Sequence, residues 1–280
     1  GDMPPKAERL FRFLTLADTH FHNRNNSPES QAGFKELLEK TKTLNADFVV
    51  VLGDVSAKDP PALAQVRQVA NESGVKCCFV RGDQDKSEAA FKEAFGETCY
   101  SFENKGWHFT AFDCVSGSGK WLNAELESIP KGMPKIFLQE ALPTSGLLAL
   151  LNKHNTALSL TSNVHGHRHG MNGSLRDVNL PPFAGGFAVL DVLADGQVAM
   201  RWRPRGFAKS LAIVHPADGA SVATGPGTIL VNAFDSYRDV LKVEFEDGSG
   251  WKPMKPAAPV TNTFMEKLPA LISDATSIKQ

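Results

Sequence analysis

The segment Asp47-Phe-Val-Val-Val-Leu-Gly-Asp54 decides the fold. Its five consecutive apolar residues, three of them β-branched, predict a strand buried on both faces, which is typical of a parallel sheet covered by helices. Similar apolar segments lie on either side, at residues 11–17 and 75–80. Helical patterns over residues 30–43 and 60–73 separate the three segments, and this alternation predicts an α/β fold.

The alternation continues to about residue 160. Further strands are predicted at residues 100–102, 107–112, 135–138 and 156–161, and further helices at residues 87–95, 121–126 and 144–153. Asp195-Gly196 is a strong two-residue turn signal, and it predicts a hairpin between residues 186–193 and 197–204.

The composition changes near Arg205, after which short strands are predicted at residues 210–216, 228–233 and 240–245. Their regular spacing, with Asp-Gly turns between them, favours a small all-β sandwich of the immunoglobulin-like kind. We therefore expect one domain over residues 8–204 and a small β-sandwich-like module over residues 207–280. The module is short of strands, because residues 256–280 contain prolines and then a weakly helical pattern.

Composition excludes several classes of protein. The net charge of −1 leaves no broad basic surface for nucleic acid. No apolar segment approaches the roughly 20 residues that span a bilayer. The four cysteines show no CxxC spacing, which favours buried free thiols. Because the chain begins Gly1-Asp2-Met3, we expect either a cytoplasmic protein or an exported one whose leader has been removed.

Polar residues that can bind metal follow each of the first three predicted strands. Asp18 and His20 follow the first, Asp54 the second and Asp83 the third. Loops that leave the carboxyl ends of neighbouring parallel strands converge on one crevice. Such a cluster suits two cations about 3.5–4 Å apart, which clamp a phosphate and lower the pKa of a bound water.

A histidine-rich turn follows the strand predicted at residues 156–161. The segment His165-Gly-His-Arg-His169 holds three of the eight histidines of the chain within five residues. Neutral imidazole is the commonest nitrogen ligand for metals, and glycine lets the backbone turn between the rings. This pattern favours a metal or phosphate role over a solvated loop.

Taken in order, these motifs resemble the signature of the calcineurin-like metallophosphoesterases. That signature runs Asp-x-His, Gly-Asp, Gly-Asn-His-Asp/Glu, a lone His and Gly-His-x-His. The resemblance covers about residues 10–204 and is specific as an ordered set. It implies a four-layer α/β sandwich built on two facing sheets.

The resemblance also implies a ligand set for one or two divalent ions (Mn, Mg, Fe, Zn or Ca). The first site would use Asp18, His20 and His169, with Asp54 bridging to the second site. In the second site Asp83 replaces the family's Asn, and Gln139 (or Glu140, because the register is loose) replaces its lone His; His167 matches. Oxygen ligands in these places predict a preference for manganese, magnesium or calcium over zinc.

A third departure concerns proton transfer. Gln84 stands where the family has the His that protonates the leaving group, and glutamine cannot transfer a proton near neutral pH. The general acid is therefore unknown, with His165 and His22 as weak candidates that are equally suited to exposed loops. Arg81 and Arg168 are candidate phosphate-binding residues, with salt bridges to neighbouring carboxylates as the alternative.

Two functions compete. The first is a metal-dependent phosphoester hydrolase, acting on a small phosphodiester or phosphomonoester through metal-bound hydroxide. The second is a catalytically impaired family member that binds a metal, a phosphorylated ligand or a protein partner. A third hypothesis assigns the main function to the C-terminal module, as a glycan-binding or protein-binding unit.

Overall fold

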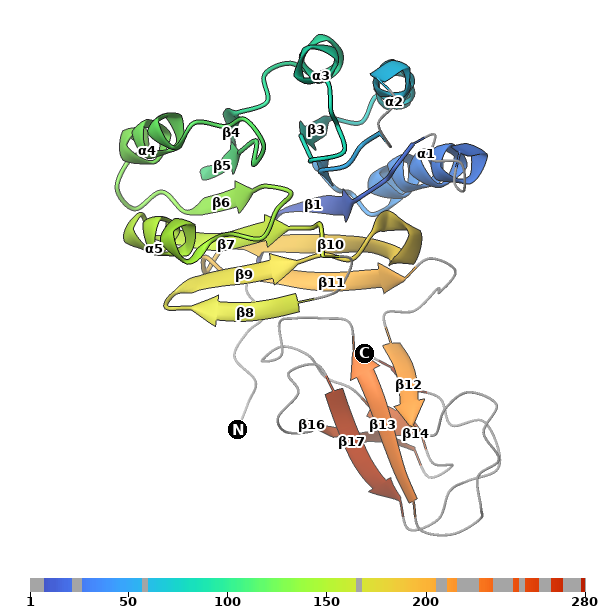
Figure 1. Ribbon diagram of the computed structural model, residues 1–280. Coiled ribbons are helices and arrows are strands. Elements are labelled where there is room, and N and C mark those ends of the chain that lie inside the picture. Colours follow the sequence, from blue (N-terminus) through green and yellow to red (C-terminus); the bar gives the residue numbers. More distant parts are fainter. Residues whose placement is uncertain are drawn as a thin grey trace.

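A computed structural model describes residues 8–21, 27–56, 60–164, 168–204, 211–215, 227–233, 244–246, 250–256, 263–268 and 278–279. Between residues 8 and 204, two sheets face each other and helices cover their outer faces (Figure 1). The elements alternate along the chain, as the apolar segments predict.

The first sheet has the strand order β11-β10-β1-β2-β3. Its strands are β1 (Arg9–Ala17), β2 (Phe48–Leu52), β3 (Cys77–Val80), β10 (Gly186–Leu193) and β11 (Val198–Pro204). The first three run parallel, so their carboxyl ends lie at one edge of the sheet. The outer face packs against α1 (Ser27–Thr43), α2 (Pro60–Ser73) and α3 (Glu88–Phe95).

The second sheet has the strand order β4-β5-β6-β7-β9-β8. Its strands are β4 (Tyr100–Asn104), β5 (Trp107–Ala111), β6 (Lys135–Leu138), β7 (Thr156–Thr161), β8 (Arg168–Asn172) and β9 (Leu175–Asn179). Its outer face packs against α4 (Gly119–Ser128) and α5 (Ser145–Lys153). A short 3-10 helix, Phe183–Gly185, precedes β10.

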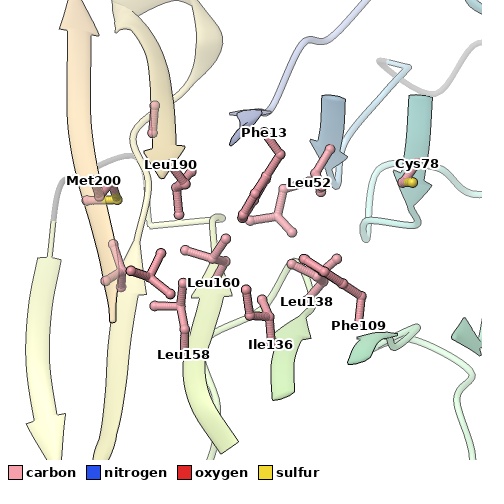
Figure 2. Packing of buried hydrophobic residues seen from close by; sticks show 14 of the residues in the cluster. Phe13, Leu52, Cys78, Phe109, Ile136, Leu138, Leu158, Leu160, Leu190 and Met200 are labelled. Atoms are coloured by element: carbon pink, nitrogen blue, oxygen red, sulfur yellow. The ribbon is translucent and has the colours of Figure 1, made fainter. Parts of the chain in front are cut away.

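The main core lies between the two sheets. Side chains such as Phe13 and Leu52 from the first sheet meet Phe109, Leu138 and others from the second (Figure 2). Because β2 buries both faces, its sequence is a continuous apolar run rather than an alternating pattern. The α/β sandwich that the sequence predicts is confirmed.

The hairpin of β8 and β9 is absent from the sequence prediction. Its strands read Arg-His-Gly-Met-Asn and Leu-Arg-Asp-Val-Asn, which are polar and lack a sustained alternation. β9 forms because it pairs in parallel with β7, and β8 then adds antiparallel to β9 as the edge strand. Tertiary pairing therefore overrides a weak local signal here.

Beyond residue 204, every described element is a strand. β12 (Leu211–His215), β13 (Gly227–Ala233), β17 (Thr263–Leu268) and β16 (Lys255–Pro256) form one sheet in that order, and β15 (Trp251–Pro253), β14 (Glu244–Glu246) and β18 (Ile278–Lys279) form another. The helical pattern expected within residues 256–280 is wrong at β17, which pairs with β13 over six residue pairs. Residues 240–243, expected in a strand, lie outside the described part.

In the part of the chain that the structure covers, the helices are too short or too polar to cross a membrane. The four cysteines are free thiols, as expected, but only Cys78 is buried, between the sheets, whereas Cys77, Cys99 and Cys114 are partly exposed.

Candidate metal centre

The loop after β1 runs beside the loop after β2 and extends their parallel pairing. The amide of Asp18 donates to the carbonyl of Gly53 at 3.3 Å, and the amide of His20 donates to the carbonyl of Asp54 at 3.0 Å. These bonds bring together the side chains of Asp18, His20 and Asp54. Each offers one ligand atom, and the three atoms lie within 4.8 Å of one another.

A second group shares Asp54. Asp83, from the loop after β3, and Glu140, from the loop after β6, each place a carboxylate oxygen within 4.8 Å of it and of each other. Glu140 comes from the second sheet, and Ser162 at the end of β7 fixes its position. The Ser162 amide donates to the Glu140 carbonyl at 2.8 Å, and its hydroxyl donates to the Leu52 carbonyl at 2.9 Å.

Two glycines make room for these carboxylates. A Cβ at Gly53 would lie 2.2 Å from Cγ of Glu140, and the residue also has a φ of +72°. A Cβ at Gly82 would lie 2.2 Å from the amide nitrogen of Asp54 and 2.4 Å from its Oδ1. Glycine therefore precedes the aspartate in both loops because a side chain at Gly53 or Gly82 would collide with Glu140 or Asp54.

The carboxylates lack the partners that buried acids require. Both oxygens of Asp18 and Oε1 of Glu140 are buried and make no hydrogen bond of standard geometry with a described residue. Asn163 lies close enough to both side chains to lower their pKa values. Burial and repulsion by Asp54 prevail, and they raise the pKa of Asp18 to about 8 and that of Glu140 to about 7. A divalent cation would compensate this concentrated negative charge, so the residues present fit a metal.

Asp85 holds two of the loops in place. Its buried carboxylate accepts the amides of Ser56 at 2.8 Å, Gly82 at 3.0 Å and Val55 at 3.1 Å. Burial, opposed by these bonds, raises its pKa to about 6. Asp85 therefore ties the loop after β2 to the loop after β3.

Gln84 lies beside the shared ligand. Its backbone amide donates to Oδ1 of Asp54 at 2.8 Å, and its side-chain amide donates to Oδ1 of Asp83. The residue therefore orients two carboxylates of the second group with hydrogen bonds that a neutral amide can make.

Arg81 has the salt-bridge role that was the alternative to phosphate binding. Its side chain is 5 % exposed, and Nη1 lies 2.9 Å from Oδ2 of Asp113, whose side chain is 0 % exposed. Nε donates to the carbonyl of Asp85 at 3.0 Å. Burial raises the pKa of Asp113, but bonds from Ser116 and Arg81 outweigh burial and hold it below its ordinary value. These contacts favour the salt-bridge alternative, and phosphate binding by Arg81 stays an untested prediction.

Other predicted residues lie apart from the two groups. Gln139 donates its side-chain amide to the carbonyl of Ala141 at 2.6 Å, while its neighbour Glu140 faces Asp54. His169, on β8, accepts from Nε of Arg176 at 3.2 Å and belongs to neither group. Arg168 is exposed at the start of β8. The remaining predicted residues, His22, His165 and His167, lie outside the described residues.

Three contributors went unrecognised in the sequence: Asn163, Cys114 and Asp113, which is the partner of Arg81. Asn163 and Asp113 carry no motif, and their partners are distant in the chain. Cys114 lies 3.4 Å from Oε2 of Glu140, and burial raises its thiol pKa to about 12. The only available signal was position, since Cys114 and Asn163 follow predicted strands.

The family profile of calcineurin-like phosphoesterases matches residues 11–206. None of the curated proteins matches the chain. A dimetal phosphatase from Danio rerio has a similar structure, with a TM-score of 0.59 and 14% identity over 71% of this chain and 97% of that one.

Two further structures are similar. One is an anchor in the inner membrane complex of Plasmodium (TM-score 0.53, 13% identity, 70% of this chain and 85% of that one). The other is a purple acid phosphatase from seeds of yellow lupin, Lupinus luteus (TM-score 0.52, 13% identity, 72% of this chain and 52% of that one). At these identities the likeness shows the fold alone. The family profile covers more than half of the chain, and the chain therefore belongs to the calcineurin-like phosphoesterase family.

Proposed function

We propose that the chain is a metal-dependent phosphoester hydrolase that acts on a small phosphorylated molecule. The observation that carries this proposal is the convergence of four carboxylates from both sheets, in which both oxygens of Asp18 and Oε1 of Glu140 are buried without a hydrogen bond of standard geometry. A fold does not tolerate such a cluster without compensation, and cations are the compensation that the family uses.

Two adjoining sites follow from the two groups. Asp18, His20 and Asp54 would hold the first ion, and Asp54, Asp83 and Glu140 the second. Glu140 replaces Gln139 in this assignment, because the Gln139 amide is turned to Ala141. His167 and His169 stay predicted ligands from the sequence motif. When bound, such ions polarise a phosphoryl oxygen and lower the pKa of a bound water.

The chain's own residues orient the metal ligands rather than transfer protons. The Gln84 amides hold Asp54 and Asp83 in place, while the residue itself cannot protonate a leaving group near neutral pH. Arg168 is an exposed cation on β8, directly after the histidine turn, and is the proposed phosphate contact. Substrates whose leaving group needs no proton should therefore react best.

The competing proposal is a binding module without turnover. The replacement of two family histidines by Gln84 and Gln139 favours it, whereas the retained Asp18, His20 and Asp54 oppose it. One similar structure is described as an anchor and others as phosphatases, so the fold does not decide between them.

Metal content and turnover separate the two proposals. We expect close to two manganese ions per chain by elemental analysis, and hydrolysis of bis(p-nitrophenyl) phosphate that depends on them. Asp54→Ala should lose both ions and all turnover, because Asp54 belongs to both groups. Asp195→Asn, in the β10–β11 turn, is the control and should change neither. Two bound ions without turnover on any phosphoester would favour the binding module.

The strands beyond residue 204 support a separate proposal. We propose that residues 207–280 form a small immunoglobulin-like β-sandwich module, because the described strands make two sheets, β12-β13-β17-β16 and β15-β14-β18. Limited proteolysis should cut near residue 205 and leave residues 8–204 folded. A fragment that unfolds after this cut would contradict the division into two domains.

A further inference from the structure

The charge of the candidate metal centre is unusual for a site that receives a phosphate. The two groups contain four carboxylates, Asp18, Asp54, Asp83 and Glu140, and one imidazole, that of His20. Ligation requires the carboxylates to be deprotonated, so they contribute four negative charges. Two divalent ions contribute four positive charges. The loaded centre, counted over the described ligands, is close to neutral before any substrate enters.

The surrounding described residues add little positive charge. Arg81, the arginine nearest in sequence to Asp83, is neutralised by Asp113 and buried. Gln84 is neutral where the family has a histidine. Arg168 is exposed, and its charge also acts on Asp177. A phosphomonoester carries about two negative charges near pH 7 or above, and a phosphodiester carries one. This balance favours the substrate with the smaller charge.

Two exposed valines lie next in sequence to residues that interact with Glu140. Val115 and Val164 are 52% and 51% exposed, which is high for large hydrophobic residues. Their neighbours in sequence, Cys114 and Asn163, both interact with Glu140. The amide of Val115 donates to Oδ1 of Asp113 at 2.8 Å, so this loop is held in place. A diester has a second ester group outside the reacting bond, and these valines offer an apolar surface for it.

We infer that the site selects monoanionic phosphodiesters with an apolar ester group over dianionic phosphomonoesters. This inference rests on the proposed function, because it requires a loaded metal centre that receives a phosphoester. It assigns a specificity role to Glu140 and Asp83, whose charges cancel the attraction of the ions for the second charge of a dianion, and to the two exposed valines.

The preference for the monoanion is tested with two probes that are not hydrolysed. Phenylphosphonate is a dianion at pH 8.5–9, and its monomethyl ester is a monoanion of nearly the same shape. Isothermal titration calorimetry compares their affinities for the manganese-loaded protein, whose metal content is verified by elemental analysis. We expect the monoanion to bind about tenfold more tightly. The reason is that a centre whose carboxylates already balance two divalent ions offers little net attraction to offset the desolvation of a second phosphoryl charge.

Variants test whether Glu140 and Asp83 cause the preference for the monoanion. Glu140→Gln and Asp83→Asn, loaded at saturating manganese, should each reduce the preference for the monoanion by about tenfold. Glu103→Gln, on the exposed face of β4, should leave it unchanged. Tighter binding of the dianion by the unmodified protein would overturn this inference alone. Failure of both probes to bind a protein that holds two ions would overturn the proposed function with it.

The role of the two exposed valines, Val115 and Val164, is tested separately. Val115→Ser and Val164→Ser should each weaken the monomethyl ester of phenylphosphonate about threefold relative to that of methylphosphonate, because each removes roughly 25–30 Å² of apolar contact. Met171→Ser, at a side chain that is 63% exposed on the edge strand β8, is the matched control. Equal loss for both esters, or no loss for either, would overturn the role of the valines.

Discussion

Replacing Arg81 by methionine should destabilise the fold rather than merely weaken phosphate binding. The guanidinium lies 2.9 Å from Oδ2 of Asp113, and both side chains are almost fully buried. It also donates to the carbonyls of Asp85 at 3.0 Å and Lys86 at 3.4 Å. Arg81→Met keeps the length of the side chain and removes its charge and all of these donors.

The expected fall in the free energy of unfolding follows from the groups that Arg81→Met leaves without a partner. Asp113 would stay buried with its charge uncompensated, and removing one partner of a buried pair costs about 3–5 kcal/mol. Two backbone carbonyls would also lose a charged donor, although both belong to a loop that water can partly reach. We therefore expect the free energy of unfolding to fall by about 3–5 kcal/mol. Because Asp85 ties two metal-binding loops together, metal affinity should fall as well.

Urea titration followed by tryptophan fluorescence measures the change in the free energy of unfolding, provided the slope m is unchanged. Arg67→Met is the matched control, because Arg67 is an exposed arginine on α2, where substitutions cost within about 0.5 kcal/mol. The double variant Arg81→Met/Asp113→Asn should recover part of the loss. Asparagine keeps an acceptor for the Val115 and Ser116 amides, and the unpaired charge is gone.

The opposite result would refute this reasoning. If Arg81→Met unfolds within 1 kcal/mol of the unmodified protein but binds phosphonates much more weakly, then Arg81 is a phosphate ligand. The salt bridge to Asp113 would then be unimportant for the fold.

Three further predictions concern the site itself. Gly82→Ala should lose metal and at least about 1–3 kcal/mol of stability, because its Cβ would collide with Asp54, while Gly119→Ala, where nothing lies within 4 Å of the new Cβ, should be neutral or slightly stabilising; elemental analysis and urea titration check both. The metal-free protein should lose stability as pH rises from about 4 to 8, because folding raises the pKa of Asp18 and the folded state therefore binds more protons in that range; urea titrations with EDTA at pH 5 and pH 8 should show a smaller loss in Asp18→Asn. Gln84→His should raise turnover of alkyl phosphodiesters by about tenfold or more and leave p-nitrophenyl esters nearly unchanged, since only the former need a general acid; a steady-state comparison that shows equal gains would contradict this.

The strands that bury both faces could be predicted from the sequence. Residues 48–52 and 136–138 are continuous apolar runs, and the predicted bounds of these strands lie within one residue of β2 and β6. The β8–β9 hairpin could not be predicted, because its residues are polar and its pairing depends on β7, which lies elsewhere in the sheet. Local sequence patterns predict well which strands are buried, but they do not predict which edge of a sheet pairs with another strand.

The candidate site was predictable to the same degree. Asp18, Asp54 and Asp83 follow parallel strands whose carboxyl ends meet, and this rule needs no coordinates. The choice between Gln139 and Glu140 does need them, because successive side chains near a strand end point in opposite directions. The role of Arg81 likewise depends on Asp113, which is 32 residues away in sequence. A side chain's type can be read from the sequence, but its partner cannot.

Backbone geometry shows that the fold assembles this centre. Asp18, His20, Asp54 and Asn163 have φ values of 49°, 45°, 48° and 72°, in the left-handed region that costs a non-glycine residue about 1 kcal/mol or more. Repulsion among the carboxylates adds to this cost, and bound cations would offset that repulsion. The loops themselves are held by backbone bonds to neighbouring loops and by the apolar core beneath β1, β2 and β7. The strain is compensated by the sandwich, and a cation entering the site meets ligands that are already in position.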